Sequence, residues 1–159
     1  MPLAAELKDH RILQKLQAFR PQSVASASLL RGELTLEIPR EYIRAVCELL
    51  KQDPELQFDS LVDLTCIDRY PVEPRFEVVY HLLSLTTRER LRLKTRLTSE
   101  NPRLDSITGL WGGANWLERE IFDLFGVHFT DHPNLRRLLM PDDWQGHPLR
   151  KDYPLEGPR

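Results

Sequence analysis

Two histidines near the C-terminal end of the chain come closest, in type and spacing, to a reactive site. His128 and His132 are four positions apart, which would place two imidazole ligands on one face of a helix. Carboxylates that could complete a metal site are close by, at Asp131, Asp142 and Asp143. A divalent cation held there could activate water, so one hypothesis is a metal-dependent hydrolase.

The neighbouring residues argue against a helix through these histidines. Gly126 precedes them and Pro133 follows, and both residue types are common at helix ends. Pro141 and the two aspartates after it resemble the first turn of a helix, where carboxylates interact favourably with the helix dipole. We therefore favour structural and capping roles, and the hydrolase is kept as an alternative hypothesis.

Compact motifs for common catalytic or nucleotide-binding sites do not occur in the sequence. There is no GxSxG, no HExxH and no glycine-rich phosphate loop, and Gly112-Gly113 alone supports phosphate binding only weakly. Cys47 and Cys66 are far apart without a CxxC motif, so they predict two buried thiols rather than a zinc or iron–sulfur centre. We predict no catalytic, cofactor-binding or metal-binding residue in this chain.

Four basic residues alternate along one predicted strand: Arg90, Arg92, Lys94 and Arg96. They could contact nucleic-acid phosphates, but no exposed aromatic residues alternate with them to stack on bases. Positive charge on a solvent-facing strand also prevents sheets from pairing edge to edge. The net charge is −2, from 22 basic and 24 acidic residues, and gives no support to a nucleic-acid binder. We favour the protective role, followed by contact with a protein partner.

The elements that must position these residues follow from hydrophobic periodicity. Apolar residues near helical spacing predict helices over residues 5–19, 41–51 and 115–125. Alternating residues predict a hairpin around Arg31-Gly32 and three later strands, over residues 24–28, 33–38, 61–68, 76–84 and 90–98. The order α–ββ–α–βββ, followed by a short helix and an extended tail, predicts an α+β fold. We expect a two-layer domain with a mixed, largely antiparallel sheet.

The third predicted helix carries a carboxylate inside its apolar arc. Asn115 and Glu118 have the spacing of an N-terminal capping box, and Gly126 marks the C-terminal end. Glu118 also falls among the apolar residues of this helix, where a carboxylate needs a cationic or N–H partner. The candidate partners are a backbone amide, Arg119, Arg136 and Arg137.

The polar face of the same helix carries a large aromatic residue, Trp116. An aromatic side chain in such a position is typical of an interface, although the chain's own tail could equally cover it. The residues predicted to share this face are Arg119, Glu120 and Asp123.

Residues 131–159 form a tail with five of the chain's 12 prolines. Proline restricts the backbone, so such a segment loses less entropy when it is ordered along a surface. The tail also holds large apolar residues, too many for a solvated terminus: Leu135, Leu138, Leu139, Met140, Trp144, Leu149 and Tyr153. We predict one unit, made of an α+β domain over residues 1–130 and an extended docking tail over residues 131–159.

Length and composition indicate a single globular domain. The chain has 159 residues, of which 41% are hydrophobic and 29% charged. No apolar run approaches the roughly 18 residues needed to cross a bilayer. The first residues show no apolar stretch of the kind found in secretory signals.

Several short motifs occur in one order in the last third of the chain. They are Glu118-Arg119-Glu120, Asp123-Leu124-Phe125-Gly126, His132-Pro133, Leu135-Arg136-Arg137-Leu138-Leu139 and the run from Gly146 to Leu155. This series, over roughly residues 106–155, resembles the C subunit of bacterial respiratory NADH:quinone oxidoreductase, complex I. The order of elements predicted upstream agrees with the fold of that family.

The resemblance implies a non-catalytic subunit of the peripheral arm, on the cytoplasmic face of a bacterial membrane. Enzymatic activity would belong to the whole proton-translocating complex, and FMN, iron–sulfur clusters and quinone to partner subunits. Its partners would be the large D subunit at the quinone site and the small cluster-bearing B subunit, with indirect membrane association and no nucleic acid. Since related assemblies reuse this protein, a membrane-bound nickel–iron hydrogenase and a ferredoxin:quinone complex remain alternatives.

On this resemblance, we expect residues of the third helix and the tail to contact the partners and to seat the quinone-reducing module. They are Trp116, Glu118, Arg119, His132, Arg136, Arg137, Trp144, His147, Arg150, Lys151 and Tyr153.

Overall fold

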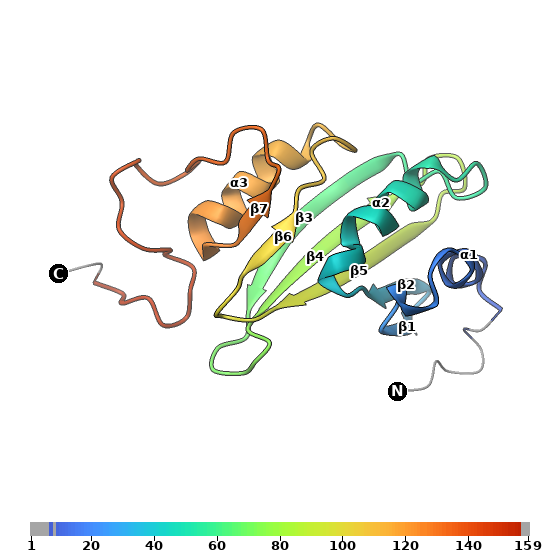
Figure 1. Cartoon of the computed structure of the whole chain (residues 1–159), viewed down its shortest axis with the longest axis horizontal. Coiled ribbons are helices and arrows are strands. Elements are labelled where there is room, and N and C mark those ends of the chain that lie inside the picture. Colours follow the sequence, from blue (N-terminus) through green and yellow to red (C-terminus); the bar gives the residue numbers. More distant parts are fainter. Residues whose placement is uncertain (1–6, 8, 157–159) are drawn as a thin grey trace.

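The computed structural model describes residue 7 and residues 9–156, and it confirms the predicted α+β class (Figure 1). Its helices are α1 (Arg11–Phe19), α2 (Ile43–Gln52) and α3 (Ala114–Phe125), with short 3-10 helices η2 (Pro21–Ser23) and η3 (Arg40–Tyr42). Its strands are β1 (Ser26–Leu30), β2 (Glu33–Glu37), β3 (Ser60–Asp68), β4 (Phe76–Leu83), β5 (Arg90–Leu97), β6 (Arg103–Asp105) and β7 (His128–Thr130).

Five of these strands form one mixed sheet, in the order β1-β2-β5-β4-β3. The β2–β5 pair is parallel, with Leu34 opposite Leu91, and the other pairs in this sheet are antiparallel. The three strands predicted over residues 61–68, 76–84 and 90–98 occur as β3, β4 and β5. Since β2 and β5 run in the same direction, the turns that lead into them lie at the same end of the sheet.

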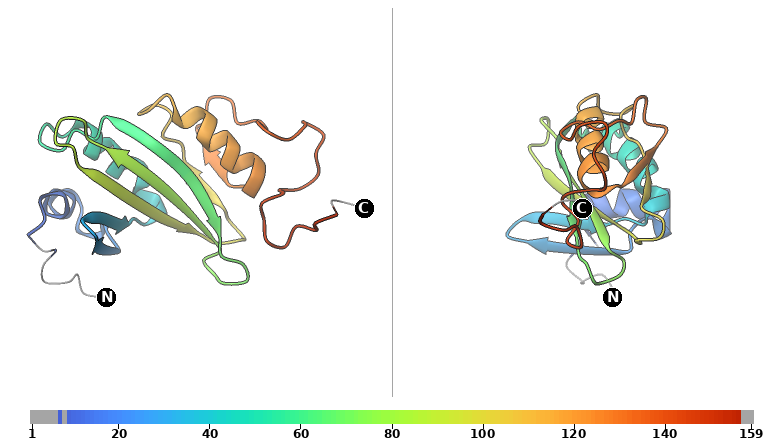
Figure 2. Two further views of the ribbon diagram at one scale, coloured as in Figure 1. Left: turned by 180° about the vertical axis from the view of Figure 1, so that it is seen from behind. Right: turned by 90° about the vertical axis from the view of Figure 1, so that its left-hand side faces the viewer.

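Helices α2 and α3 lie over one face of this sheet and leave the other face open (Figures 1 and 2). The strand β4 lies between β3 and β5, and its Phe76, Val78 and Tyr80 are fully buried. On β5 the leucines are buried, whereas Arg92 and Arg96 retain solvent exposure. This alternation is typical of a sheet covered on one side, and it confirms the two-faced pattern predicted for β5.

Both cysteines are buried free thiols, as predicted. Cys47 lies on α2 and Cys66 on β3. Burial raises the pKa of Cys66 to about 12, so this sulfur stays a neutral thiol at physiological pH.

One small sheet was not predicted. Strands β6 and β7 pair in parallel and place Leu104 beside Phe129, and both side chains are buried. Three residues are too few to show a hydrophobic period, so the sequence pattern gave no signal for either strand. At the other end of the chain, the helix predicted over residues 5–19 begins only at Arg11, and the described residues 7, 9 and 10 before it are not α-helical. Residues 5, 6 and 8 lie outside the described residues.

The capping box predicted for the third helix is wrong, whereas its C-terminal glycine is confirmed. Helix α3 begins at Ala114, and its N-cap, Gly113, makes no side-chain capping hydrogen bond. Glu118 therefore lies more than one turn inside the helix, where its carboxylate points to a neighbouring loop rather than back to Asn115. Gly126 ends the helix in the left-handed conformation, at φ 75°.

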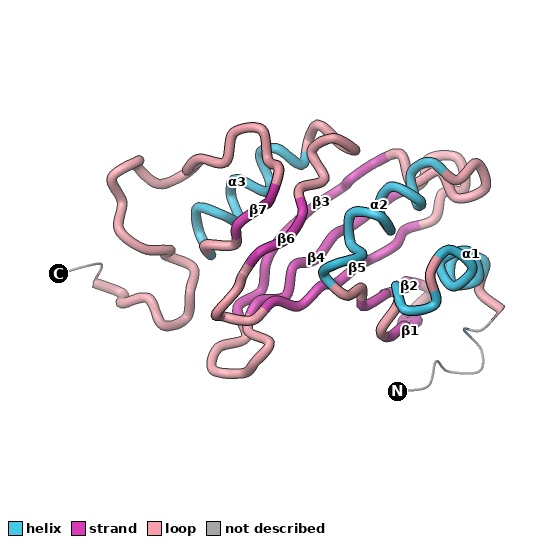
Figure 3. Tube along the Cα trace, in the orientation of Figure 1, coloured by secondary structure: helices cyan, strands magenta, loops and turns pink. Residues whose placement is uncertain are grey.

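The tail after β7 contains no helix or strand within residues 131–156 (Figure 3). It continues from β7, follows a wide arc and returns toward the end of the sheet where β3 finishes (Figure 1). Polar contacts with α3 and with the sheet, rather than a hydrogen-bonded ladder, therefore determine its path. None of the described helices is both long and apolar enough to cross a membrane.

Candidate functional site

The carboxylate of Asp123 is the centre of the contact between α3 and the tail. The side chain is fully buried, and its Oδ2 accepts hydrogen bonds from three successive tail amides, those of Leu138, Leu139 and Met140, at 2.7–2.9 Å. Burial alone would raise the pKa of Asp123. The hydrogen bonds from the Met140 amide and from Arg137 outweigh that effect and hold the pKa below its usual range. An ionised carboxylate thus bends the tail around itself.

Arg137 extends this contact from the tail side. Its Nη1 donates to Oδ1 of Asp123 at 2.6 Å and to the Asp123 carbonyl at 3.1 Å. Its Nη2 donates to the carbonyls of Trp144 and Gly146, both at 2.9 Å. One guanidinium group therefore joins α3 to two separate points of the tail, a geometry that the branched donors of arginine provide and lysine does not.

Arg119 is also buried against the tail. Its Nε and Nη2 donate to the carbonyls of Arg136 and Arg137, at 3.1 and 3.0 Å. The sequence pattern placed Arg119 and Asp123 on the polar face of the helix, and the tail covers part of that face, so that both side chains are buried. Trp116, on the same face, keeps 61% of its surface exposed and has the Arg119 guanidinium over its ring.

The C-terminal end of α3 is closed by tail residues. Nε of Arg150 donates to the Phe125 carbonyl at 2.6 Å, so a positive charge lies at the negative end of the helix dipole. Nδ1 of His147 donates to the Asp123 carbonyl at 2.9 Å. A Cβ on Gly126 would lie 2.5 Å from atoms of both His147 and Arg150. Glycine is thus required here by the close approach of the tail as well as by the backbone conformation.

A second cluster attaches the far part of the tail to the sheet. Arg75, which lies just before β4, makes paired hydrogen bonds with Asp68 at 2.8–2.9 Å and with Asp152 of the tail at 2.6–3.0 Å. The Lys151 amide donates to Asp68 at 2.8 Å. Although burial acts to raise the pKa of Asp68, its hydrogen bonds with Arg75 and with backbone amides lower that pKa to about 2. This carboxylate therefore remains ionised and holds the tail in place.

Glu118 is fully buried on the sheet-facing side of α3. Its Oε1 accepts the Ile107 amide at 2.8 Å, and its Oε2 accepts the Ser106 hydroxyl at 2.7 Å. The partner is thus a backbone amide, one of the predicted candidates, together with a serine that was not predicted. Burial raises the pKa of Glu118 to about 7 despite these hydrogen bonds.

His132 connects the start of the tail to this region. Its Nε2 lies 3.2 Å from the Asn115 carbonyl and 3.9 Å from Oε2 of Glu118. The Asn134 amide donates to Nδ1 at 3.0 Å, so these contacts assign the neutral tautomer with hydrogen on Nε2. Burial lowers the pKa of His132, consistent with a neutral ring.

The residues of the metal-site hypothesis do not form a cluster. His128 is exposed on the short strand β7, so it does not share a helix face with His132. Within the described residues, no group of three or more His, Cys, Asp or Glu side chains could hold a metal ion. The polar groups at α3 are instead arranged to fix the course of the tail.

Comparison with known proteins decides the family. The family model described as the 30 Kd subunit of respiratory-chain NADH dehydrogenase matches residues 36–159. The chain belongs to this family. The C subunit of NADH-quinone oxidoreductase from Roseiflexus sp. (strain RS-1) is 49% identical over 149 residues, 94% of this chain and 86% of that protein. The C subunit of the same enzyme from Citrifermentans bemidjiense is 44% identical over 151 residues, 95% of this chain and 92% of that protein.

Solved structures also share the fold of this chain. A trypsin-resistant fragment of Nqo5 (residues 1–134) superposes with a TM-score of 0.63 at 34% identity, over 77% of this chain and 97% of the fragment. The membrane-bound sulfane sulfur reductase, an archaeal respiratory membrane complex, contains a chain with a TM-score of 0.74 at 24% identity. That match covers 91% of this chain and 84% of the other, and it shows similarity of fold alone. The resemblance seen in the sequence motifs is confirmed.

Most of the side chains predicted for partner contact are used inside this chain. Besides those described above, Tyr153 donates from its hydroxyl to the Gln145 carbonyl at 3.2 Å. Trp144 is half-buried, and its Nε1 has no hydrogen-bond partner among the described residues. The predicted residues whose side chains face solvent are Trp116, Arg136 and Lys151. Contact of these residues with partner subunits stays a prediction.

Several residues that organise this site were not predicted as part of it. Arg75 and Asp152 are 77 residues apart, so no local pattern connects them. Asp123 belongs to one of the motifs that carry the family resemblance, which is the signal that could have identified it. The other missed residues are Asp68 and Ser106.

Proposed function

We propose that this chain is a non-catalytic subunit of the peripheral arm of a proton-translocating NADH:quinone oxidoreductase, needed for assembly and for seating the quinone-reducing module. The relatives described above are named as C subunits of that enzyme and align with more than nine-tenths of this chain. Those names favour NADH as the electron donor over hydrogen or ferredoxin. We expect FMN, iron–sulfur clusters and quinone to be bound by partner subunits.

The observation that carries this proposal is that the charged groups between α3 and the tail form hydrogen bonds with each other and with the backbone of the chain. The carboxylate of Asp123 and the guanidinium groups of Arg119 and Arg137 each make two or more hydrogen bonds within the chain. Groups bound in this way are poorly suited to bind a substrate or transfer a proton. They are well suited to hold a loop in one shape before a partner binds, which reduces the entropy lost on binding.

The surface that this loop presents is the proposed contact with the D and B subunits, the large one at the quinone site and the small one that carries a cluster. Trp116 is 61% exposed on α3, and the tail carries Leu139 and Leu149, which are 61% and 52% exposed. Large side chains with this exposure, supported by a rigid frame, are the usual anchors of protein interfaces. We expect this chain to be attached to the cytoplasmic face of the membrane indirectly, through the complex.

Deletion of residues 130–159 tests this proposal in a strain that carries the variant chain. We expect native gel electrophoresis to show loss of the assembled complex, and membranes to lose NADH:quinone activity. Electron transfer from NADH to a soluble acceptor should persist if the NADH-oxidising part assembles alone. Intact complex and full NADH:quinone activity after the deletion would overturn the proposal.

A further inference from the structure

Two arginines occupy equivalent positions in two neighbouring turns. Arg31 lies in the β1–β2 turn and Arg88 in the β4–β5 turn, and both have left-handed backbones, at φ 52° and 60°. Strands β2 and β5 are parallel, with Leu34 opposite Leu91. Continuing that register backward by three residues pairs Arg31 with Arg88. The two side chains also line one hollow, of about 310 Å³, at this end of the sheet.

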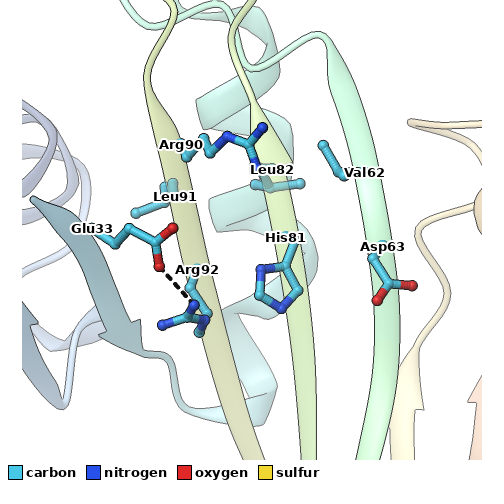
Figure 4. Close-up of a pocket in the computed structure, with 8 residues that line it drawn as sticks. All are labelled: Glu33, Val62, Asp63, His81, Leu82, Arg90, Leu91 and Arg92. Carbon is cyan, nitrogen blue, oxygen red and sulfur yellow. Dashed lines mark hydrogen bonds and ion pairs between the residues drawn. The ribbon is translucent and has the colours of Figure 1, made fainter. Parts of the chain in front are cut away.

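This hollow continues onto the open face of the sheet. A second hollow of about 250 Å³ shares Glu33 and Arg90 with the first one (Figure 4). In Figure 4 the Arg90 and Arg92 side chains come from β5, and Glu33 reaches Arg92 from β2. The two hollows form one surface, which we call the arginine groove. Four arginines line it, namely Arg31, Arg88, Arg90 and Arg92, and Arg11 lies beside it through an ion pair with Glu89.

The arginine groove carries an excess of positive charge. Glu89 pairs with Arg11, and Glu33 pairs with Arg92 at 2.8 Å. The other three arginines are exposed and have no acidic partner among the described residues. Asp63, at the far side of the second hollow, accepts a hydrogen bond from the Leu64 amide. These pairs leave three unpaired arginines against Asp63, so the groove has a modest excess of positive charge on a chain whose net charge is −2.

The conformation of the two turn arginines is unfavourable for the isolated chain. A left-handed backbone is strained for arginine, and Asn-Gly would suit the Arg31-Gly32 turn better. Like charges at neighbouring positions of paired strands also repel each other. Backbone pairing closes both turns, but neither arginine side chain has a hydrogen-bond or ion-pair partner among the described residues. Guanidinium groups without an acidic partner in neighbouring turns are available to bind carboxylates of another molecule.

We propose that the arginine groove binds an acidic segment of a partner protein. Carboxylates match the paired donors of guanidinium groups. Leu30, which directly precedes Arg31 in the sequence, is exposed and offers the segment an apolar contact beside the arginines. A recessed channel with Glu33 and Glu89 in its wall suits individual carboxylates rather than the flat, uniform charge of a membrane surface. This contact lies at the opposite end of the sheet from the tail (Figure 1).

The double variant Arg31→Asn/Arg88→Asn separates binding from folding. Asparagine tolerates the left-handed conformation, so the melting temperature of the purified full chain should stay the same or rise. When this chain is titrated into complex depleted of it, we expect association on the order of tenfold weaker, with release at lower salt. The matched control is Arg103→Asn, which removes an exposed arginine beyond the other end of β5 and should change neither property.

The variant Arg31→Lys/Arg88→Lys identifies the occupant in the assembled complex. It keeps both charges and introduces amines that a carbodiimide joins directly to carboxylates in contact with them. We expect mass spectrometry to find cross-links from these lysines to an Asp- or Glu-rich segment of another subunit. The proposal would be overturned if the asparagine variant associated with the complex as strongly as the unchanged chain does. A melting temperature of the asparagine variant below that of the unchanged chain would also overturn it.

Two further outcomes would also overturn it. One is the absence of intersubunit cross-links from the introduced lysines in assembled complex. The other is that the unchanged chain binds phosphatidylglycerol vesicles and the asparagine variant does not, which would make the groove a membrane contact. Loss of complex on deleting the tail, with no effect of the arginine variants, would reject this inference alone and leave the proposed function standing.

Discussion

Asp123 of α3 and Arg137 of the tail form a buried ion pair in which Oδ1 lies 2.6 Å from Nη1. The same carboxylate binds three tail amides, and the same guanidinium binds two tail carbonyls. Residues 137–146 are thereby tied to one helix position through two side chains. A segment without regular secondary structure acquires a single course in this way, and its stability should depend strongly on this pair.

Asp123→Asn should lower the free energy of unfolding by about 3 kcal/mol, because Arg137 loses its buried counter-charge. Urea denaturation measures this loss, and limited proteolysis should detect cleavage within residues 131–156. Asp143→Asn is the control, since Asp143 is exposed and should change stability by less than about 0.5 kcal/mol. Equal stability of the two variants would contradict the role assigned to Asp123.

Gly126→Ala should destabilise the chain by about 2–4 kcal/mol, through the left-handed backbone and the clash with His147 and Arg150. Thermal unfolding followed by circular dichroism measures the effect. Gly109→Ala provides the comparison, because a Cβ there meets nothing within 4 Å and its φ is not left-handed. We expect its melting temperature to match that of the unchanged chain, and a shift similar to that of Gly126→Ala would show that neither cause operates.

Glu118 should make stability fall as pH rises. Its pKa is about 7 when folded and has an ordinary value of 4.5. Between these values the unfolded chain releases a proton that the folded chain keeps, so the contribution of Glu118 to stability is lost as pH rises. The free energy of unfolding of Glu118→Gln, relative to that of the unchanged chain at the same pH, should rise by about 3 kcal/mol from pH 4 to pH 8. Denaturation curves at several pH values measure this difference, and a constant difference would refute the assignment.

Trp116→Ala should leave the isolated chain nearly as stable as before, within about 1 kcal/mol, because the removed contact is a partly exposed stack with Arg119. In the complex we expect a clear loss of assembly, since a large exposed aromatic is a typical interface anchor. Native gel electrophoresis of membranes gives the second measurement. Normal assembly with the alanine variant would remove Trp116 from the interface. Phe19→Ala, on exposed α1 surface, is a suitable control.

Local pattern was sufficient for most of the fold. The alternation in β5 and the apolar stripe of α2 follow directly from the periods of a strand and a helix. The short strands β6 and β7 escaped prediction because three residues show no period. The burial of Arg119 and Asp123 was not predicted, for a different reason: periodicity assigns a helix face by its polarity, and it cannot show that another segment covers a polar face.

By itself the sequence determined the α+β class, the main elements and the family, because periodicity and ordered motifs are properties of neighbouring residues. The tertiary structure alone decided where the charged groups find their partners. Arg75 meets Asp152 across 77 residues, and Arg31 and Arg88 line one hollow because the turns that lead into the parallel strands β2 and β5 lie at the same end of the sheet. Such pairings depend on which segments the hydrophobic core brings together. A buried charge is stable only where that packing supplies its counter-charge or hydrogen bond.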